Sequence, residues 1–178
     1  LPPEEPVPIR MAIAEGKLST RAPVTTIDAS NLSNVGIYAV SEGSIAGQYP
    51  WTSTPFALNL VPSGISGSQL SYYPRTTATS GSNYITAPGN GVAPAYHFTL
   101  TGAEDIMYAA GTPTGSTSTM PVSLTFNHVL TQLQLNTSLL GALSSIKLLG
   151  VYNKGTLDIG NGNVTYDSST TDITLTVP

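Results

Sequence analysis

Short apolar–polar alternations, each ended by glycine, proline or asparagine, are the feature of this chain that most restricts its fold. An alternation with a period of two is typical of a half-buried β-strand, whereas an amphipathic helix repeats every 3.6 residues. Asn161-Gly162, between two apolar segments, is the strongest hairpin signal. Roughly ten strands and almost no helix favour an all-β fold, an antiparallel β-sandwich. The clearest segments are residues 9–16, 34–41, 56–60, 69–74, 82–88, 95–100, 146–152 and 172–177.

Residues 120–137 change the phase of their alternation at Asn127-His128. A β-bulge inserts one extra residue and produces such a change, so we expect two in-line strand segments that continue beyond His128 to Leu135. The same apolar residues also fit helical spacing, and a helix is the alternative. No nucleophile or carboxylate lies near His128 in the sequence. We therefore expect its ring nitrogens to bond backbone groups freed by the bulge.

The composition fits short strands joined by many turns. Charged residues are only 9% of the chain, against roughly 25% in an ordinary soluble domain. Ser and Thr number 44, so hydroxyls replace charges on the wet faces. The net charge of −4 gives no reason to expect nucleic acid or an anionic membrane as partner. There is no cysteine, which excludes disulfides and thiolate sites, and no run is long enough to be a transmembrane helix.

No constellation of residues indicates catalysis, a cofactor or a metal. Glu104 and Asp105 are adjacent, and neighbours in an extended segment point to opposite sides, which argues against an acid–base pair. His97 lies in an alternating segment and is expected on a strand face. Oxygen-bearing side chains at residues 158–167 leave a calcium loop as an alternative, but a hairpin explains them more simply. We therefore predict a protein that is not an enzyme.

The N-terminal residues divide into two parts. Residues 1–8 hold four prolines and are expected to form an extended tether. The remainder, residues 9–178, is expected to be a single domain. Its first strand carries Ile9, Met11 and Ile13 on one face and is expected to be held by one sheet edge.

Two aromatic residues near the middle of the chain are candidates for ligand contact. Tyr49 and Trp51 lie in the segment QYPW, and exposed aromatic side chains can stack on sugars or bind a protein partner. Half-buried packing is the alternative for both.

Several segments, taken in order, resemble the fimbrillins of the Bacteroidetes, including the Mfa-like group. These are STRAP, NVGIYAV, YYP, EDIMYA at residues 104–109 and PVSLTFNHVLTQLQL from residue 121. The most specific part is a D-[IL]-M-Y-A element followed by V-x-L-x-F-x-H-x-L-x-x-L. The resemblance extends from about Pro8 to Val151.

The resemblance implies a structural subunit of a type V pilus with a transthyretin-like, Greek-key sandwich. It implies an exported lipoprotein precursor at the outer membrane, with a lipid-bearing cysteine upstream of Leu1. Family members usually have two sandwich domains, and residues 9–178 correspond to the N-terminal one. The implied partners are other fimbrial subunits, and host or bacterial surface ligands are further candidates. The alternative function is a tip adhesin or a carbohydrate- or protein-binding surface module.

In this family a protease removes an N-terminal segment, and a strand of the next subunit fills the groove. The expected cut follows Arg21 and precedes Ala22, and the removable strand is the one that carries Ile9, Met11 and Ile13. The alternative is a permanent first strand.

Overall fold

The computed structural model describes residues 7–14, 32–41, 44–50, 58–60, 69–88, 92–111, 120–131, 133 and 144–176. Within these ranges the protein is all-β, with one 3-10 turn (η1, Leu32–Asn34). This confirms the predicted fold class. The strands are Val7–Ala14 (β1), Gly36–Ser41 (β2), Ser44–Pro50 (β3), Leu58–Leu60 (β4), Gln69–Tyr73 (β5), Tyr84–Thr86 (β6), Ala95–Thr99 (β7), Met107–Gly111 (β8), Met120–Thr125 (β9), Asn127–His128 (β10), Ser145–Val151 (β11), Lys154–Asp158 (β12), Val164–Tyr166 (β13) and Thr171–Thr176 (β14).

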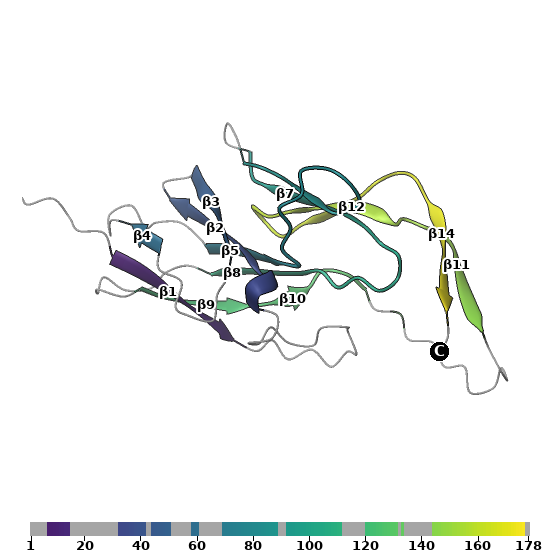
Figure 1. The fold of residues 1–178 in the computed structure, drawn as a ribbon, viewed down its shortest axis with the longest axis horizontal. Helices are drawn as coiled ribbons and strands as arrows, with labels where there is room; N and C mark the ends of the chain where they lie inside the picture. The colour runs from purple at the N-terminus through teal and green to yellow at the C-terminus, as the bar shows by residue number, and fades with distance from the viewer. Residues whose placement is uncertain are drawn as a thin grey trace, which may run out of the picture.

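The described strands form four sheets, with the orders β4-β1-β9, β10-β8-β5-β2-β3, β13-β12-β7-β6 and β11-β14. Their pairings are antiparallel, except that β1 runs parallel to β9. In Figure 1 the five-stranded sheet lies between the sheet of β1 and the sheet of β7 and β12. The β11–β14 ribbon lies at the end of the molecule opposite β1.

Consecutive buried residues show that the five-stranded sheet is covered on both faces. Ile37 and Tyr38 are buried in β2, and Leu70, Ser71 and Tyr72 are buried in β5. Because neighbouring side chains in a strand point to opposite faces, each face must pack against another layer. In β2 the sequence is apolar at successive positions, which suits burial of both faces, whereas in β5 the polar Ser71 is buried on the second face.

One face of this sheet packs on the sheet of β7 and β12 through aromatic rings. Tyr72 stands between Tyr38 and Tyr96, at centroid distances of 6.4 and 5.5 Å, and Phe98 lies 6.4 Å from Tyr96. Offset and tilted ring pairs at such distances are favourable beyond the area that they bury. Leu157 and Ile159 complete the cluster from the side of β12. Tyr38, Tyr72 and Tyr96 therefore serve as core residues.

The β12–β13 hairpin forms where Asn161-Gly162 predicted it. Gly155 pairs with Tyr166 and Leu157 with Val164. Gly162 has a φ of +78°, which other residues rarely adopt. The hairpin is thus specified by the turn residues, as the sequence indicated.

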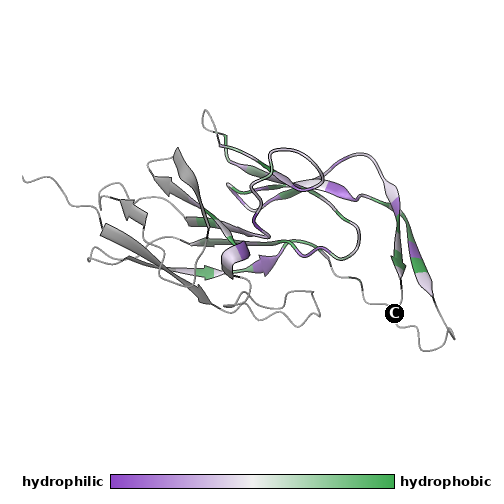
Figure 2. Ribbon diagram, in the orientation of Figure 1, coloured by the Kyte–Doolittle hydropathy of each residue, from purple (hydrophilic) through white to green (hydrophobic). Residues whose placement is uncertain are grey.

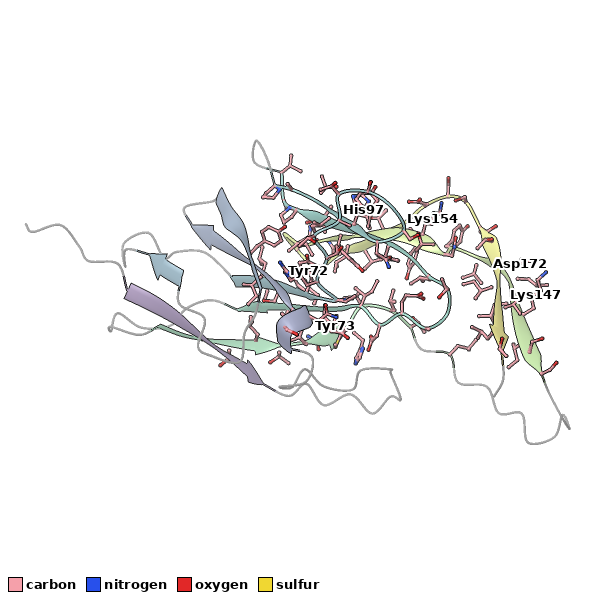
Figure 3. All side chains as sticks on the ribbon, in the orientation of Figure 1. Tyr72, Tyr73, His97, Lys147, Lys154 and Asp172 are labelled. Atoms are coloured by element: carbon pink, nitrogen blue, oxygen red, sulfur yellow. The ribbon has the colours of Figure 1, made fainter. Side chains whose placement is uncertain are left out.

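The β11–β14 ribbon separates apolar from polar side chains. Ile146 pairs with Leu175 and Leu148 with Ile173, while Lys147 and Asp172 lie on the strands as an exposed ion pair of 2.8 Å. Figure 2 shows the apolar and polar stretches along β11, and Figure 3 shows Lys147 and Asp172 at this end of the molecule. Exposed pairs of this kind contribute little to stability.

The 120–137 segment differs from its prediction. β9 and β10 are in line and separated by Phe126, but they belong to different sheets, since β9 pairs with β1 and β10 with β8. A change of sheet, common at the corners of sandwiches, replaces the predicted bulge. The second segment ends at His128, and Leu133 is 60% exposed outside any strand. The helix alternative is wrong for the described part of this segment.

The boundary of the first strand also differs by two residues. β1 begins at Val7, so Val7 and Pro8 belong to a strand and not to the expected tether. The division of the chain into a tether and one domain stays a prediction.

Candidate assembly site at the N-terminal strand

The first strand is held by two segments that are distant in the sequence. Ile9 to Ala14 pair in parallel with Met120 to Thr125 of β9. Val7 to Ile9 pair antiparallel with Leu58 to Leu60 of β4. We call β4 and β9 together the seat of β1. β1 therefore has two neighbouring strands and not the single sheet edge that we expected, although residues 10–14 pair with β9 alone.

The register places the predicted removable residues opposite β9. Ile9, Met11 and Ile13 lie opposite Met120, Val122 and Leu124, respectively. Leu124 is fully buried, with 0% of its surface exposed. Ile13 thus pairs with a residue of β9 that belongs to the protein interior.

The other predicted residues are less informative. Arg10 lies in β1 opposite Pro121, inside the ladder as expected. Tyr49 lies in β3, an edge strand of the five-stranded sheet, opposite Ile37. Arg21, Ala22 and Trp51 lie outside the described residues.

A buried Asp–His pair fixes the strand that continues from the seat. The Nδ1 atom of His128 lies 2.6 Å from Oδ1 of Asp105, and the two side chains are 10% and 6% exposed. Next to this pair, the Val129 amide donates to the Ile106 carbonyl at 2.9 Å. A carboxylate acceptor orients the imidazole and is a strong hydrogen-bond partner. Together these bonds hold β10 beside β8.

The prediction for His128 is therefore wrong in its partner. Its ring bonds a carboxylate 23 residues away and not the backbone of a bulge. In the structure β10 pairs with β8 through His128 and Met107. Once that register is known, the residue two places before Met107 falls beside the histidine. Sequence spacing alone could not supply the register.

Tyr108, three residues after Asp105, ties the same strand to the opposite sheet. Its hydroxyl donates to the Ile159 carbonyl at 3.1 Å, and burial raises the pKa of Tyr108, with a smaller contribution from Asp158. A Cβ on Gly162 would come within 2.5 Å of the Tyr108 ring. The segment EDIMYA is thus a junction that bonds β10 on one side and the β12–β13 turn on the other.

Glu104 serves a different purpose from its neighbour Asp105. Its carboxylate accepts hydrogen bonds from the backbone amides of Thr101, Gly102 and Ala103, at 2.6, 3.0 and 3.2 Å. It also accepts a hydrogen bond from the Thr101 hydroxyl, at 2.5 Å. Burial alone would raise the pKa of Glu104, but these hydrogen bonds outweigh it and hold the pKa below its ordinary value. The two carboxylates therefore have separate structural partners.

The remaining candidate groups have local partners. His97 is a strand-face residue as predicted, bonded to the Thr86 and Thr156 hydroxyls at 2.9 and 3.1 Å and stacked on Tyr84 at 4.2 Å. The Asp158 carboxylate accepts hydrogen bonds from the Gly160 amide and from the side-chain NH2 of Asn161. Such bonds are usual for an aspartate in a turn.

The described residues contain neither a cluster of metal-binding side chains nor a membrane-spanning helix. No group of three His, Cys, Asp or Glu side chains lies close enough together to hold a metal. Among the helices in the described ranges, none has the length and hydrophobicity needed to cross a membrane.

Comparison with known proteins assigns the family. The fimbrillin-like family model matches residues 20–177, and the chain belongs to that family. Both motif segments named above lie inside this match, and the Asp105–His128 pair joins them.

Two solved structures share the fold. A candidate cell adhesion protein from Bacteroides thetaiotaomicron is 13% identical, with a TM-score of 0.52 over 97% of this chain and 71% of the other. A second, from Bacteroides ovatus, is 15% identical, with a TM-score of 0.52 over 98% of this chain and 73% of the other. A search of curated protein sequences finds no match.

Proposed function

We propose that this protein is a structural subunit of a cell-surface fimbria and assembles by exchange of its first strand. In this proposal a protease cuts after Arg21, β1 leaves, and a strand of another subunit occupies the seat. The observation that carries the proposal is the pairing of β1, which is held by the distant strands β4 and β9. The fimbrillin-like family assignment supports it.

The β9 side of the seat has its own support, independent of β1. β9 continues into β10, and β10 is anchored by β8 and by the Asp105–His128 pair. None of these bonds involves β1, so departure of the strand leaves the position of β9 defined. An open β9 edge offers main-chain groups to a replacement strand, and alternate pockets select its side chains.

The free energy favours replacement over an empty seat. Burying Ile9, Met11 and Ile13 is worth at most roughly 1.5–3 kcal/mol each, and that contribution is lost when the strand leaves. The interior beside Leu124 would then meet water, and an exposed apolar patch of this kind tends to bind a partner. A donor strand with the same alternation of apolar and polar residues buries its own apolar side chains and covers the surface beside Leu124 again.

The proposal also covers partners and location. We expect the partners to be other fimbrial subunits, and host or bacterial surface ligands in addition. We expect export to the cell surface, with attachment to the outer membrane through a lipid anchor upstream of Leu1. Residues 9–178 would act as one domain, with a structural and not an enzymatic role.

Limited digestion with an arginine-specific protease tests this proposal. We expect an early cut after Arg21 and a product that forms oligomers, as measured by size-exclusion chromatography with light scattering. Arg21→Lys should abolish the early cut, while the matched control Arg10→Lys should leave it unchanged. A cut product that stays monomeric and binds no strand would overturn strand exchange.

The alternative function is a surface binding module that acts through Tyr49 and Trp51. A glycan array separates the two functions. Strong binding that is lost in Trp51→Ala would support the binding module, whereas no effect of this substitution would argue against it.

A further inference from the structure

The turn between β12 and β13 contains an Asn-Gly pair, Asn161-Gly162, whose asparagine is exposed to solvent. An asparagine that precedes glycine is prone to deamidation, because glycine has no Cβ to hinder the approach of its backbone nitrogen to the asparagine side chain. The residues that specify this turn therefore also make it chemically reactive.

The reaction needs only water as a co-reactant. The backbone nitrogen of Gly162 loses its proton and attacks Cγ of Asn161. The new N–C bond closes a succinimide ring, the bond between Cγ and Nδ2 breaks, and ammonia leaves with the proton that Gly162 lost. Water then opens the ring at either carbonyl and gives aspartate or isoaspartate. The Gly162 nitrogen must therefore be free of its hydrogen bond, and the Asn161 side chain must turn toward it.

The folded turn opposes both conditions, mainly through Asp158. The Gly162 amide donates to the Asp158 carbonyl at 2.7 Å. The side-chain NH2 of Asn161 donates to the Asp158 carboxylate at 2.9 Å, and the side-chain oxygen of Asn161 accepts a hydrogen bond from the Asn163 amide at 2.8 Å. The attacking nitrogen and the side chain that it must reach are thus each held by other partners.

Contacts with two other strands keep the turn in place. The Ile159 amide donates to the Pro94 carbonyl at 3.0 Å, and the Ile159 carbonyl accepts a hydrogen bond from the Tyr108 hydroxyl at 3.1 Å. The Tyr108 ring also fills the space beside Gly162, where a Cβ would come within 2.5 Å of it. Segments with such contacts open less often than loose loops and frayed ends.

We infer that Asn161 is a deamidation site that reacts only when the β12–β13 turn opens, and that Asp158 keeps it unreacted in the folded protein. The product hinders reclosure. A carboxylate at this position replaces the NH2 donor, and two like charges then face each other where a 2.9 Å hydrogen bond was. Isoaspartate also inserts an extra carbon atom into the main chain. The inference does not depend on the fimbrial proposal.

A time course of deamidation in the whole protein tests the inference. The protein is incubated both folded and in urea that unfolds it, and peptide mass spectrometry measures conversion at Asn161. Asn90-Gly91 is a second copy of the same dipeptide and serves as the internal reference in urea. We expect Asn161 to react in urea at a rate similar to that of Asn90. In the folded protein it should react at least about tenfold more slowly, because opening breaks more than one hydrogen bond.

Substitutions separate the holding of the turn from the chemistry. In the folded protein Asp158→Ala should speed conversion of Asn161 about three- to tenfold, the factor for one hydrogen bond. Asp158→Asn keeps a side-chain acceptor and should give a rate between those of Asp158→Ala and the parent. In urea Gly162→Ala should slow the reaction, since the new Cβ obstructs the attack. The matched control Asp167→Ala removes a carboxylate at the far end of the hairpin, where the Asp167 amide donates to the Lys154 carbonyl, and should leave the rate unchanged.

Unfolding curves establish that each variant is folded at the temperature of incubation. If Asp158→Ala does not fold, Asp158→Asn decides the same point, since it should still react faster than the parent. Equal rates at Asn161 in the folded protein and in urea, or a folded Asp158→Ala variant as slow as the parent, would overturn the inference. An unreactive Asn161 in urea, or equal acceleration by Asp167→Ala, would do the same.

Discussion

Removal of the His128 side chain should be among the most damaging single changes at the junction of β9 and β10. The substitution His128→Ala leaves Asp105 buried, 6% exposed, without its 2.6 Å partner. A hydrogen bond to a charged group contributes roughly 1.5–3 kcal/mol, and a half-broken buried pair costs roughly 3–5 kcal/mol. Asp105 has a further interaction that remains, so we expect a loss of about 2–4 kcal/mol.

Chemical and thermal unfolding measure this loss. For a chain of this length, about 1 kcal/mol corresponds to roughly 2–4 °C, so the melting temperature should fall by roughly 5–15 °C. The matched control is His97→Ala, whose ring bonds two threonine hydroxyls on a strand face and should cost roughly 1 kcal/mol.

A double-mutant cycle with Asp105→Ala isolates the pair itself. We expect a coupling energy of at least about 1 kcal/mol between the two positions, as is usual for residues in one buried network. A His128→Ala stability within about 0.5 kcal/mol of the parent, or additive effects in the cycle, would refute the reasoning.

Three further changes probe the same junction. Glu104→Gln should make the free energy of unfolding less dependent on pH in acid. The pKa of Glu104 in the folded protein is below its ordinary value of 4.5, so its stabilisation is complete above pH 4.5 and disappears as the pH falls through the folded pKa. Urea unfolding at several pH values measures this dependence. Gly162→Ala should cost roughly 1–3 kcal/mol, because its φ of +78° is strained for alanine and the new Cβ would meet the Tyr108 ring; unchanged stability would contradict this. Tyr108→Phe should cost roughly 1 kcal/mol, the value of its bond to the Ile159 carbonyl, by thermal unfolding.

Local patterns predicted many of the strands because these strands are encoded by their own residues, but β3 (Ser44–Pro50) and β8 (Met107–Gly111) were not predicted. The alternation around Ile37, Phe98 and Ile173 and the turn at Asn161-Gly162 are local signals, and the strands lie where these signals placed them. Burial of both faces agrees with the continuous apolar residues of β2, whereas the buried Ser71 of β5 carries no such signal.

The pairing of distant segments could not be predicted in the same way. The change of sheet at Phe126 depends on which strands flank β9 and β10, and these strands lie far away in the sequence. The partner of His128 depends on the register between β10 and β8, which only the tertiary structure fixes.

The central claim is that the seat of β1 accepts a replacement strand. The direct measurement uses the chain from which residues 1–21 have been removed by cleavage after Arg21, together with a fluorescent peptide that has the sequence of β1, VPIRMAIA. Fluorescence anisotropy reports binding, and a control peptide with aspartate in place of the residues that match Met11 and Ile13 tests the apolar pockets. We expect the β1 peptide to bind the cleaved chain saturably, the uncleaved chain to bind none, and the aspartate peptide to fail. Equal binding of both peptides, or no binding by the cleaved and still folded chain, would contradict the account.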